Sequence, residues 1–152
     1  MPQEGVMNVE QLLKTKGLEA TTVDPKMTIA ATARLLTERN RGLALVCAAD
    51  DTVLGVVSVI DISRAVGDFA ADAAGMPVQD IMTVDFTFCR PGDSVERALL
   101  TMTERGIRHL PVVEDGTLKG LLNIRGVLEA RFEEAELKAE ELLKYVTGVG
   151  YH

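Results

Sequence analysis

Hydrophobic positions along the chain follow a helical period at two matching places. Between residues 95 and 102, apolar side chains recur at i, i+3, i+4 and i+7, which predicts one helix face, and residues 29–36 match this pattern. Asp93 precedes the helix at 95–102 and Glu96 follows three residues later, so Asp93 is predicted to cap that helix. Shorter helical signals open each half of the chain, at 9–13 and 78–82.

Two strand-like runs follow each of these helices and are joined by a polar turn, which predicts a β-hairpin in each half. At the second turn, Asp115-Gly116 is typical of a tight hairpin loop. A short extended segment is expected ahead of each long helix, and another helix is expected after each hairpin, starting near Asp61 and near Gly126. The predicted strands are 20–23, 43–48 and 53–59 in the first half, and 86–89, 110–113 and 118–124 in the second.

The two halves form a tandem duplication. Thr37-Glu38-Arg39 recurs 66 residues later as Thr103-Glu104-Arg105, and Gly55 recurs 65 residues later as Gly120. Each repeat has roughly 60–65 residues, a size at which an independent core is marginal. The repeats are therefore expected to pack on each other in an α+β fold.

We place the first repeat at 7–70, the second at 76–130, and an amphipathic C-terminal helix at 127–147. The apolar residues of this helix step by 4 and 3 in a heptad-like stripe, and Gly148 and Gly150 are expected to end it. The stripe has fewer than three heptads, so an independent coiled coil is not expected. Packing over its own repeats and packing against a partner subunit are both open. The stripe consists of Leu128, Phe132, Ala135, Ala139, Leu142 and Val146.

Composition narrows the function classes. The chain has 152 residues, a net charge of −7 and a pI near 4.8, which opposes binding to duplex nucleic acid but allows a small anionic ligand held by local cations. No apolar run approaches the roughly 18 residues needed to span a membrane. The N-terminus lacks the basic start and apolar stretch of a signal peptide, so a cytoplasmic location is expected.

Residue types that carry catalysis are sparse. Cys47 and Cys89 stand in apolar runs and are interpreted as buried small hydrophobes, with a redox or metal role as the alternative. The histidines are His109 and the terminal His152, and no nucleophile–base set or metal-ligand cluster is evident. We therefore assign no catalytic or metal-binding residue and do not expect an enzyme.

The ordered motifs resemble a known family. The run at 105–113, followed by Glu-Asp-Gly and by Gly-Leu-Leu-Asn at 120–123, resembles the cystathionine-β-synthase (CBS) domain. Two such domains in tandem resemble a Bateman module, and the resemblance covers about 7–130. The chain is similar to stand-alone bacterial two-CBS signal-transduction proteins. The resemblance implies two β-α-β-β-α repeats in a pseudo-twofold pair, an adenosyl ligand in the cleft between them, flat homodimers and a regulatory role.

In this family a Gly-apolar-apolar-Ser/Thr-x-x-Asp segment closes the nucleotide site, and it is intact at 55–61. The resemblance implies that Asp61 accepts both ribose hydroxyls and Ser58 donates to a phosphate; the alternative for Asp61 is a helix cap alone. Asn123 and Gly126 occupy these positions in the second repeat. Asn123 can still contact a phosphate, but Gly126 cannot bind a diol. One strong nucleotide site per chain is therefore expected.

Arg108 and His109 form a local cation pair at a strand entrance and are expected to reach phosphates in the shared cleft. A hydrogen-bonded, half-buried side chain is the alternative for His109. Leu45 and Pro111 are expected to line the adenine pocket, although a core would use them equally well. Further candidates are Thr22, Arg41, Arg64 and Arg125.

These inferences predict a homodimeric regulatory module that reversibly binds an adenosyl ligand, without a tightly bound cofactor. AMP is the first expectation, and ADP, ATP, NAD(H) and S-adenosylmethionine are also compatible with the sequence. The alternative is a ligand-independent dimeric interaction scaffold. The sequence identifies no downstream protein partner.

Overall fold

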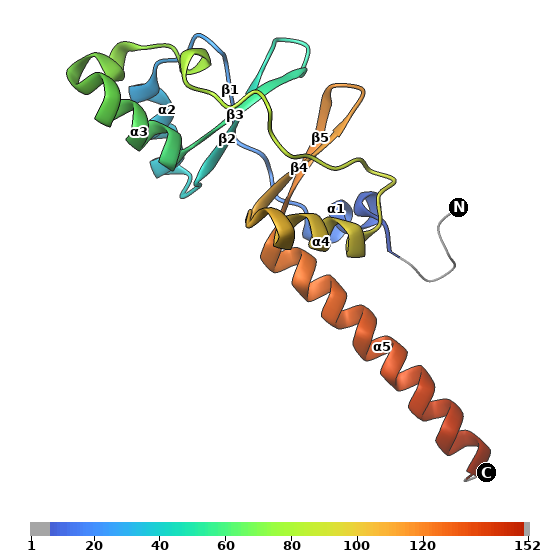
Figure 1. The fold of residues 1–152 in the computed structure, drawn as a ribbon. Coiled ribbons are helices and arrows are strands. Elements are labelled where there is room, and N and C mark those ends of the chain that lie inside the picture. The colour runs from blue at the N-terminus through green and yellow to red at the C-terminus, as the bar shows by residue number, and fades with distance from the viewer. Residues whose placement is uncertain (1–6, 151–152) are drawn as a thin grey trace.

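The computed structural model describes residues 7–150 and confirms an α+β fold of two repeats (Figure 1). In the first repeat β1 pairs parallel with β2, which pairs antiparallel with β3; in the second, β4 and β5 pair antiparallel. The elements are α1 (Val9–Lys16), β1 (Thr22–Val23), α2 (Ile29–Glu38), β2 (Leu43–Cys47), β3 (Val53–Ser58), α3 (Val59–Phe69), the 3-10 helices η1 (Ala70–Gly75) and η2 (Val78–Asp80), α4 (Val95–Arg105), β4 (His109–Glu114), β5 (Thr117–Asn123) and α5 (Ile124–Gly150).

The helix that opens the first repeat packs on the second repeat. Val9 and Leu12 of α1 are buried in the same cluster as Met102 and Leu110. The Val9 amide donates to the Asp93 carbonyl oxygen over 2.8 Å, which fixes α1 beside the start of α4. The apolar face of α1 therefore completes a core that the second repeat cannot close alone.

The segment that opens the second repeat makes the reciprocal contact. Val78 of η2 is buried in the first-repeat core, and its amide donates to the Met27 carbonyl oxygen over 2.7 Å. Farther along, Thr83 and Val56 exchange two backbone hydrogen bonds of 2.8 and 2.9 Å. The two repeats in the sequence thus differ from the two units in space, because each unit borrows its opening segment from the other repeat.

Two equivalent glycines make these crossings possible. A Cβ atom added at Gly55 would lie 2.8 Å from the Thr83 carbonyl oxygen, and one at Gly120 would lie 2.8 Å from a methyl group of Leu13. Both distances are too short for ordinary contact, so the crossing segments approach the strands closely only where a side chain is missing. The matching glycines of the duplication therefore serve the same packing role in both units.

The two hairpins meet through their turns and inner faces, and they lie side by side in Figure 1. The Val53 amide donates to the Gly116 carbonyl oxygen over 2.9 Å, beside a shared cluster that contains Leu45, Cys47 and Leu121. Positive φ angles at Asp115 (51°) and Gly116 (78°) confirm the tight turn that this dipeptide predicts.

Several local predictions were wrong in position or extent. Ser94 caps α4, its hydroxyl accepting the Arg97 amide over 3.1 Å, because the Asp93 carboxylate is used by the Arg90 amide. The helical signal at 78–82 forms only one 3-10 turn. The strand expected at 86–89 is reduced to a single bridge from Cys89 to β4.

The C-terminal helix is longer than predicted. It begins at Ile124, continues through Gly148 and ends at Gly150. Val127 and Ala130 are buried against the body, and Lys16 of α1 contacts the Glu129 and Glu133 carboxylates at 3.0 and 3.1 Å. Beyond this anchored turn, α5 projects away from both units in Figure 1.

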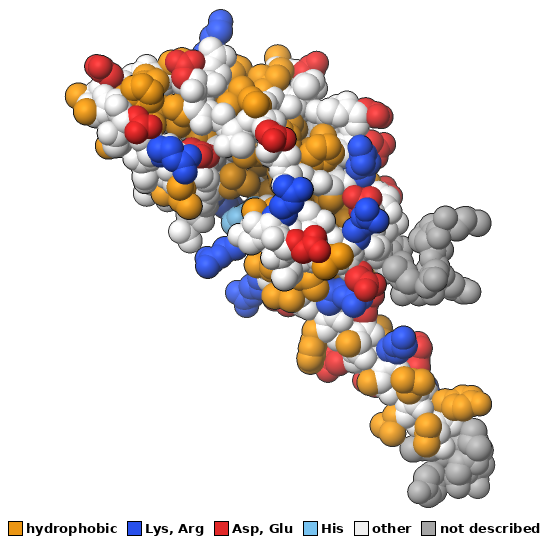
Figure 2. Space-filling view, viewed as in Figure 1, with side chains coloured by type: hydrophobic (Ala, Val, Ile, Leu, Met, Phe, Trp, Pro, Cys, Tyr) orange, Lys and Arg blue, Asp and Glu red, His pale blue; other side chains and the backbone are white. Residues whose placement is uncertain are grey.

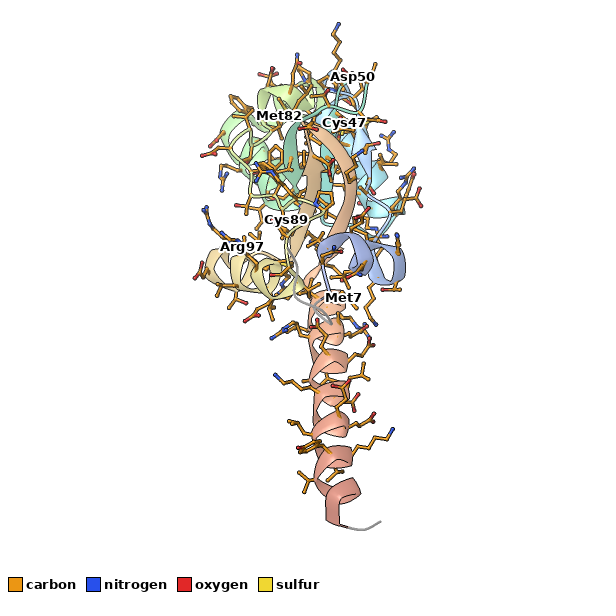
Figure 3. All side chains as sticks on the ribbon, turned by 90° about the vertical axis from the view of Figure 1, so that its right-hand side faces the viewer. Met7, Cys47, Asp50, Met82, Cys89 and Arg97 are labelled. Atoms are coloured by element: carbon orange, nitrogen blue, oxygen red, sulfur yellow. The ribbon has the colours of Figure 1, made fainter. Side chains whose placement is uncertain are left out.

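The stripe on α5 does not pack over the repeats of its own chain. Figure 3 shows side chains around the projecting part of α5 with no other element over them. The physical reason is that Val127 and Ala130, which are not members of the stripe, occupy the face that meets the body. Four large apolar residues of the stripe are exposed: Leu128, Phe132, Leu142 and Val146. Within residues 7–150, no helix is both long and apolar enough to cross a membrane.

The glycine crossings give a stability prediction. Gly55→Ala should lower the free energy of unfolding by about 1–3 kcal/mol, because the new methyl group meets the Thr83 backbone. Gly120→Ala should cost less, since the Leu13 side chain can rotate away. Gly92→Ala, with open space around the position, is the matched control. Urea denaturation of the three variants measures these differences, and equal midpoints for Gly55→Ala and Gly92→Ala would contradict the close crossing.

Candidate functional site

The Ser58-to-Asp61 segment forms the start of α3 as a closed capping box. The Asp61 amide donates to the Ser58 hydroxyl oxygen over 3.1 Å. In return, Asp61 Oδ2 accepts from the Ser58 amide over 2.8 Å and from the Ser58 hydroxyl over 3.0 Å. Ser58 is thus the N-cap and Asp61 the third helical residue, so the interpretation of Asp61 as the cap was wrong by three positions.

The Asp61 carboxylate keeps one oxygen outside the box. Asp61 Oδ1 lies 3.6 Å from Nη1 of Arg64, a loose pair whose arginine side chain is largely exposed. The Asp61 side chain itself is 13% exposed. Asp61 therefore presents one weakly engaged oxygen at the surface while the other holds the helix start.

The second repeat has the same arrangement of a side-chain cap at the start of the helix that follows its hairpin, but with different side chains. Asn123 Oδ1 accepts from the Gly126 amide over 2.8 Å and begins α5, as Ser58 begins α3. The strand register also matches, because Leu43 lies opposite Ser58 and His109 lies opposite Asn123. The same backbone arrangement thus carries the Asp61 carboxylate in the first unit and the His109 side chain in the second.

Gly126 is more than a neutral helix start. A Cβ atom added there would lie 3.0 Å from Asn123 Oδ1 and 3.3 Å from the Lys16 backbone oxygen. Gly126 therefore allows α1 to pack closely on the start of α5.

Two arginines and a histidine lie at the strand entrances of the two units. Burial lowers the pKa of His109, and the positive charges of Arg41 and Arg108 lower it further. Arg41 precedes β2 and Arg108 precedes β4, so the cluster joins the two units. Within residues 7–150, neither arginine forms an ion pair with a carboxylate, which leaves their charges available to an anion.

The remaining candidate site residues are partly buried in the core and partly exposed at the surface. Leu45 is fully buried in the cluster between the hairpins, and Pro111 is also buried, so both serve the core and neither lines an open pocket in this structure. Thr22 is exposed on β1 in register with Leu45. Arg125 contacts Glu129 over 3.1 Å along α5.

Arg41 is only a further candidate in the sequence, and in the structure its positive charge acts on His109. The repeat equivalent of Arg41 is Ile107, so the alignment of the repeats does not pair it with Arg108. The distance of an arginine from the following strand could have identified Arg41. Each repeat has one arginine within two residues of the strand that follows its long helix. The strand entrances converge in the fold and bring both arginines to His109.

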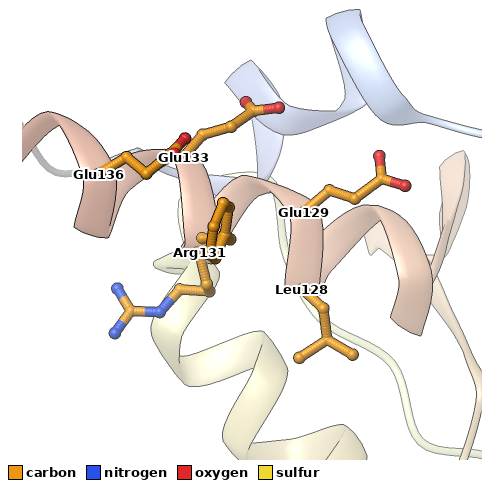
Figure 4. A pocket seen from close by; sticks show the side chains of 6 residues that line it. Leu128, Glu129, Arg131, Glu133 and Glu136 are labelled. Carbon is orange, nitrogen blue, oxygen red and sulfur yellow. The ribbon is translucent and has the colours of Figure 1, made fainter.

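Hollows lie beside Arg41 and along α5. One of about 300 Å³ lies between α2 and α3, where Arg41, Val59 and Ile62 contribute to its wall. Another of about 790 Å³ lies along the first turns of α5 and is drawn in Figure 4. Arg41 is therefore the member of the cation cluster that also borders a concave surface.

Both cysteines are buried, as expected for small hydrophobic residues. Burial raises the pKa of the Cys47 thiol and raises that of Cys89 to about 12, which keeps both thiols protonated at neutral pH. Among the described residues, no group of three or more His, Cys, Asp or Glu side chains is placed to hold a metal ion.

Comparison with known proteins agrees with a fold of two related repeats. The family model for the CBS domain matches residues 9–68 and 78–133. The chain belongs to the CBS-domain family. The match to both repeats confirms the resemblance that the ordered motifs carry, and the structure has the fold of CBS-domain pairs.

Several similar proteins have a length close to that of this chain. A 17.7 kDa protein of Acidianus ambivalens is 30% identical over 93% of this chain and 84% of its own. The solved structure of a CBS-domain containing protein of Agrobacterium tumefaciens is 32% identical, covers 82% of this chain and 99% of its own, and gives a TM-score of 0.72. CBSX2, solved in complex with AMP, is 26% identical, covers 83% and 96%, and gives a TM-score of 0.71. The chain spans only 19% and 41% of two other curated relatives.

The capping geometry predicts equal structural costs at two serines. Ser58→Ala and Ser94→Ala each remove an N-cap hydroxyl and should each lower the free energy of unfolding by about 1 kcal/mol. Chemical denaturation monitored by circular dichroism measures both. Unchanged stability in Ser58→Ala would show that the α3 capping box is not formed in solution.

Proposed function

We propose that this CBS-domain protein is a regulatory module that reversibly binds an adenine nucleotide, with AMP as the first candidate. The observation that carries the proposal is the cluster of Arg41, Arg108 and His109, in which neither arginine has a partner carboxylate in the described part of the chain. The cluster stands at the strand entrances, where the duplicated frame also places Ser58 and Asp61. A phosphate would balance the cations, and the AMP complex of CBSX2 supports the same ligand class.

The charge of the cluster favours phosphates over other adenosyl ligands. S-adenosylmethionine carries a sulfonium cation, which two uncompensated arginines would repel. AMP, ADP and ATP all carry anionic phosphate, and Arg can donate two parallel hydrogen bonds to it. NAD(H) shares the phosphate chemistry and is separated from the mononucleotides only by measurement.

Each residue has a distinct role in the proposed complex. Asp61 Oδ1, the oxygen outside the capping box, accepts from a ribose hydroxyl. The Ser58 hydroxyl donates to Asp61 before binding and turns its proton toward the phosphate on binding. Arg108 and His109 contact the phosphate from the second repeat, with Asn123 opposite His109 in register. The absence of a carboxylate at Gly126 limits strong binding to one nucleotide per chain.

The proposed module is a cytoplasmic homodimer that regulates and does not catalyse. The nucleotide would favour one arrangement of the two units to the extent that it binds that arrangement more tightly. No tightly bound cofactor is needed for this role. The exposed apolar residues of α5 favour a second candidate, in which the chain is a dimeric interaction scaffold that needs no ligand.

A thermal-shift screen followed by calorimetry separates the two functions. AMP at 100 times its dissociation constant should stabilise the protein by about 2.7 kcal/mol, and calorimetry should give one site per chain. Asp61→Ala should weaken binding about ten- to a hundred-fold, the loss expected for one hydrogen-bonded charged acceptor. Ser94→Ala, which loses a cap outside the site, should bind as the wild type does.

Absence of stabilisation by AMP, ADP, ATP and NAD(H) would leave the scaffold as the better account. Equal affinity in Asp61→Ala and wild type would return Asp61 to a purely structural role. A shared loss of affinity in Asp61→Ala and Ser94→Ala would mean that general destabilisation causes the effect.

The pH dependence of binding tests the His109 contact. The pKa of His109 is lowered in the free protein, and a bound phosphate should raise it, so binding takes up a proton. Affinity should therefore increase as pH falls through the raised pKa of the complex, by at most about tenfold per pH unit, and level off below the lowered pKa of the free protein. Phosphate itself titrates near pH 6, so the measurement compares wild type with His109→Gln. Identical calorimetric pH profiles for the two proteins would exclude His109 from the phosphate site.

A further inference from the structure

The first turns of α5 have two distinct apolar faces. Val127 and Ala130 face the body and are buried in the core of the second repeat. Leu128 and Phe132 lie on a different face and are 50% and 65% exposed. With about 100° between successive residues, the exposed face is centred well over 90° from the buried one. The body therefore leaves the exposed face open to a second molecule.

The exposed face continues along the projecting part of the helix as the stripe defined above. Orange side chains mark α5 well beyond the body in Figure 2. In a heptad, Phe132, Ala139 and Val146 take the a positions, and Leu128, Ala135 and Leu142 take the d positions. From residue 128 to residue 146 the helix rises about 27 Å. This is a coiled-coil seam without a partner in the single chain.

Opposite charges flank the two sides of this seam. Glu129 and Glu136 occupy e positions on one side, and Arg131 and Lys138 occupy g positions on the other. Figure 4 shows Glu129 directed toward the α1 side of α5 and Arg131 directed away from it. A second copy of this helix therefore presents, on its own flanks, charges opposite in sign to those on each flank of the first.

The charges also select an orientation. In a parallel pair, the g side of each helix meets the e side of its partner, so Arg131 lies near Glu136 of the second copy and the reciprocal pair forms by symmetry. In an antiparallel pair, e meets e and g meets g, which places glutamates against glutamates. Like charges at these positions oppose association.

We propose that α5 pairs in parallel with α5 of a second copy through the 128–146 seam. The proposal rests on the homodimer proposed above and specifies the surface and the orientation that form it. The bodies lie outside the pair, because Val127 and Ala130 turn each body away from the seam.

The short seam suffices because the helix is already started. An isolated helix of this length is marginal in water, chiefly because its first turn is costly to form. In α5 that turn is built on the body, with Asn123 capping it and Lys16 holding Glu129 and Glu133. Pairing therefore extends a helix that exists instead of nucleating one.

The first test uses two leucines of equal exposure. Leu142 lies in the seam and Leu137 lies on the opposite side of the helix, and both are 59% exposed. Analytical ultracentrifugation over a concentration series should show the wild type as a dimer. Leu142→Glu should raise the dimer dissociation constant at least tenfold, and Leu137→Glu should leave it within about twofold of the wild type. Both side chains are at the surface of the single chain, so neither variant should prevent folding.

The second test exchanges charges across the pair. Arg131→Glu and Glu136→Arg should each weaken the dimer several-fold, and the double variant should restore it. Arg131 also lies 3.5 Å from Glu134 of its own chain, and the double variant does not restore that contact. Recovery of the dimer in the double variant would therefore support the contact between copies.

A third measurement fixes the orientation. Val146→Cys should form a disulfide with itself in a parallel pair, whereas an antiparallel pair places the two cysteines roughly 27 Å apart. The native Cys47 and Cys89 are buried and do not compete.

The outcomes distinguish this proposal from the homodimer on which it rests. A stable dimer that Leu142→Glu does not weaken would overturn the α5 pairing and leave a homodimer formed by another surface. A wild type that is monomeric at micromolar concentration would overturn both. Failure of the charge exchange to restore the dimer, or of Val146→Cys to cross-link, would overturn the parallel orientation.

Discussion

The fold depends on the exchange of opening segments between the two repeats. α1 lies against β5 at Gly120, and the chain at Thr83 lies against β3 at Gly55, both at contact distances that leave no room for a Cβ atom. Neither unit has a complete core without the segment it receives, since Val9 and Leu12 enter one core and Val78 enters the other. The exchange thus gives two marginal repeats the cooperative stability of one larger domain. It also fixes the hairpins side by side, and this places the two strand entrances close together.

The chemistry of the site arises from differences within that duplicated frame. Both units begin the helix after the hairpin with a side-chain cap, Ser58 in one and Asn123 in the other. The residue opposite the cap is Leu43 in the first unit and His109 in the second. Duplication therefore supplied two equivalent sets of positions, and sequence divergence has given a carboxylate, Asp61, to one unit and a histidine, His109, to the other.

Much of the fold follows from the sequence because local periodicity and turn chemistry are strong signals. The order of helices and hairpins and the Asp115-Gly116 turn were all predictable. The exchange was not predictable from periodicity, because α1 has the same apolar face whether it packs on its own repeat or on the other. Gly55 and Gly120 stand at equivalent strand positions where the structure needs a missing side chain, but a glycine in a strand does not by itself show which segment packs there.

The site was less predictable than the fold, for a physical reason. Leu45 and Pro111 are apolar residues of a strand, and an adenine pocket and a core between two hairpins require the same side chains. Only the packing of the hairpins on each other decides between these uses. Arg41 was ranked low for a related reason, because its proximity to His109 depends on how two strand entrances converge in space.

The capping box connects the proposed ligand to the arrangement of the units. Ser58 and Asp61 satisfy each other in the free protein, so a nucleotide that accepts a hydrogen bond from the Ser58 hydroxyl must replace the one that this hydroxyl donates to Asp61 within the capping box of α3. The Val59 amide, next in the chain, donates to the Gly42 carbonyl oxygen over 3.1 Å, and Gly42 adjoins Arg41. The cap at Ser58 is therefore connected to Arg41 through Val59, one hydrogen bond and Gly42. Arg41 in turn lowers the pKa of His109 in the other unit. Occupation of this site would act on the contact between the units as well as on one helix, and this is the property that a regulatory module requires.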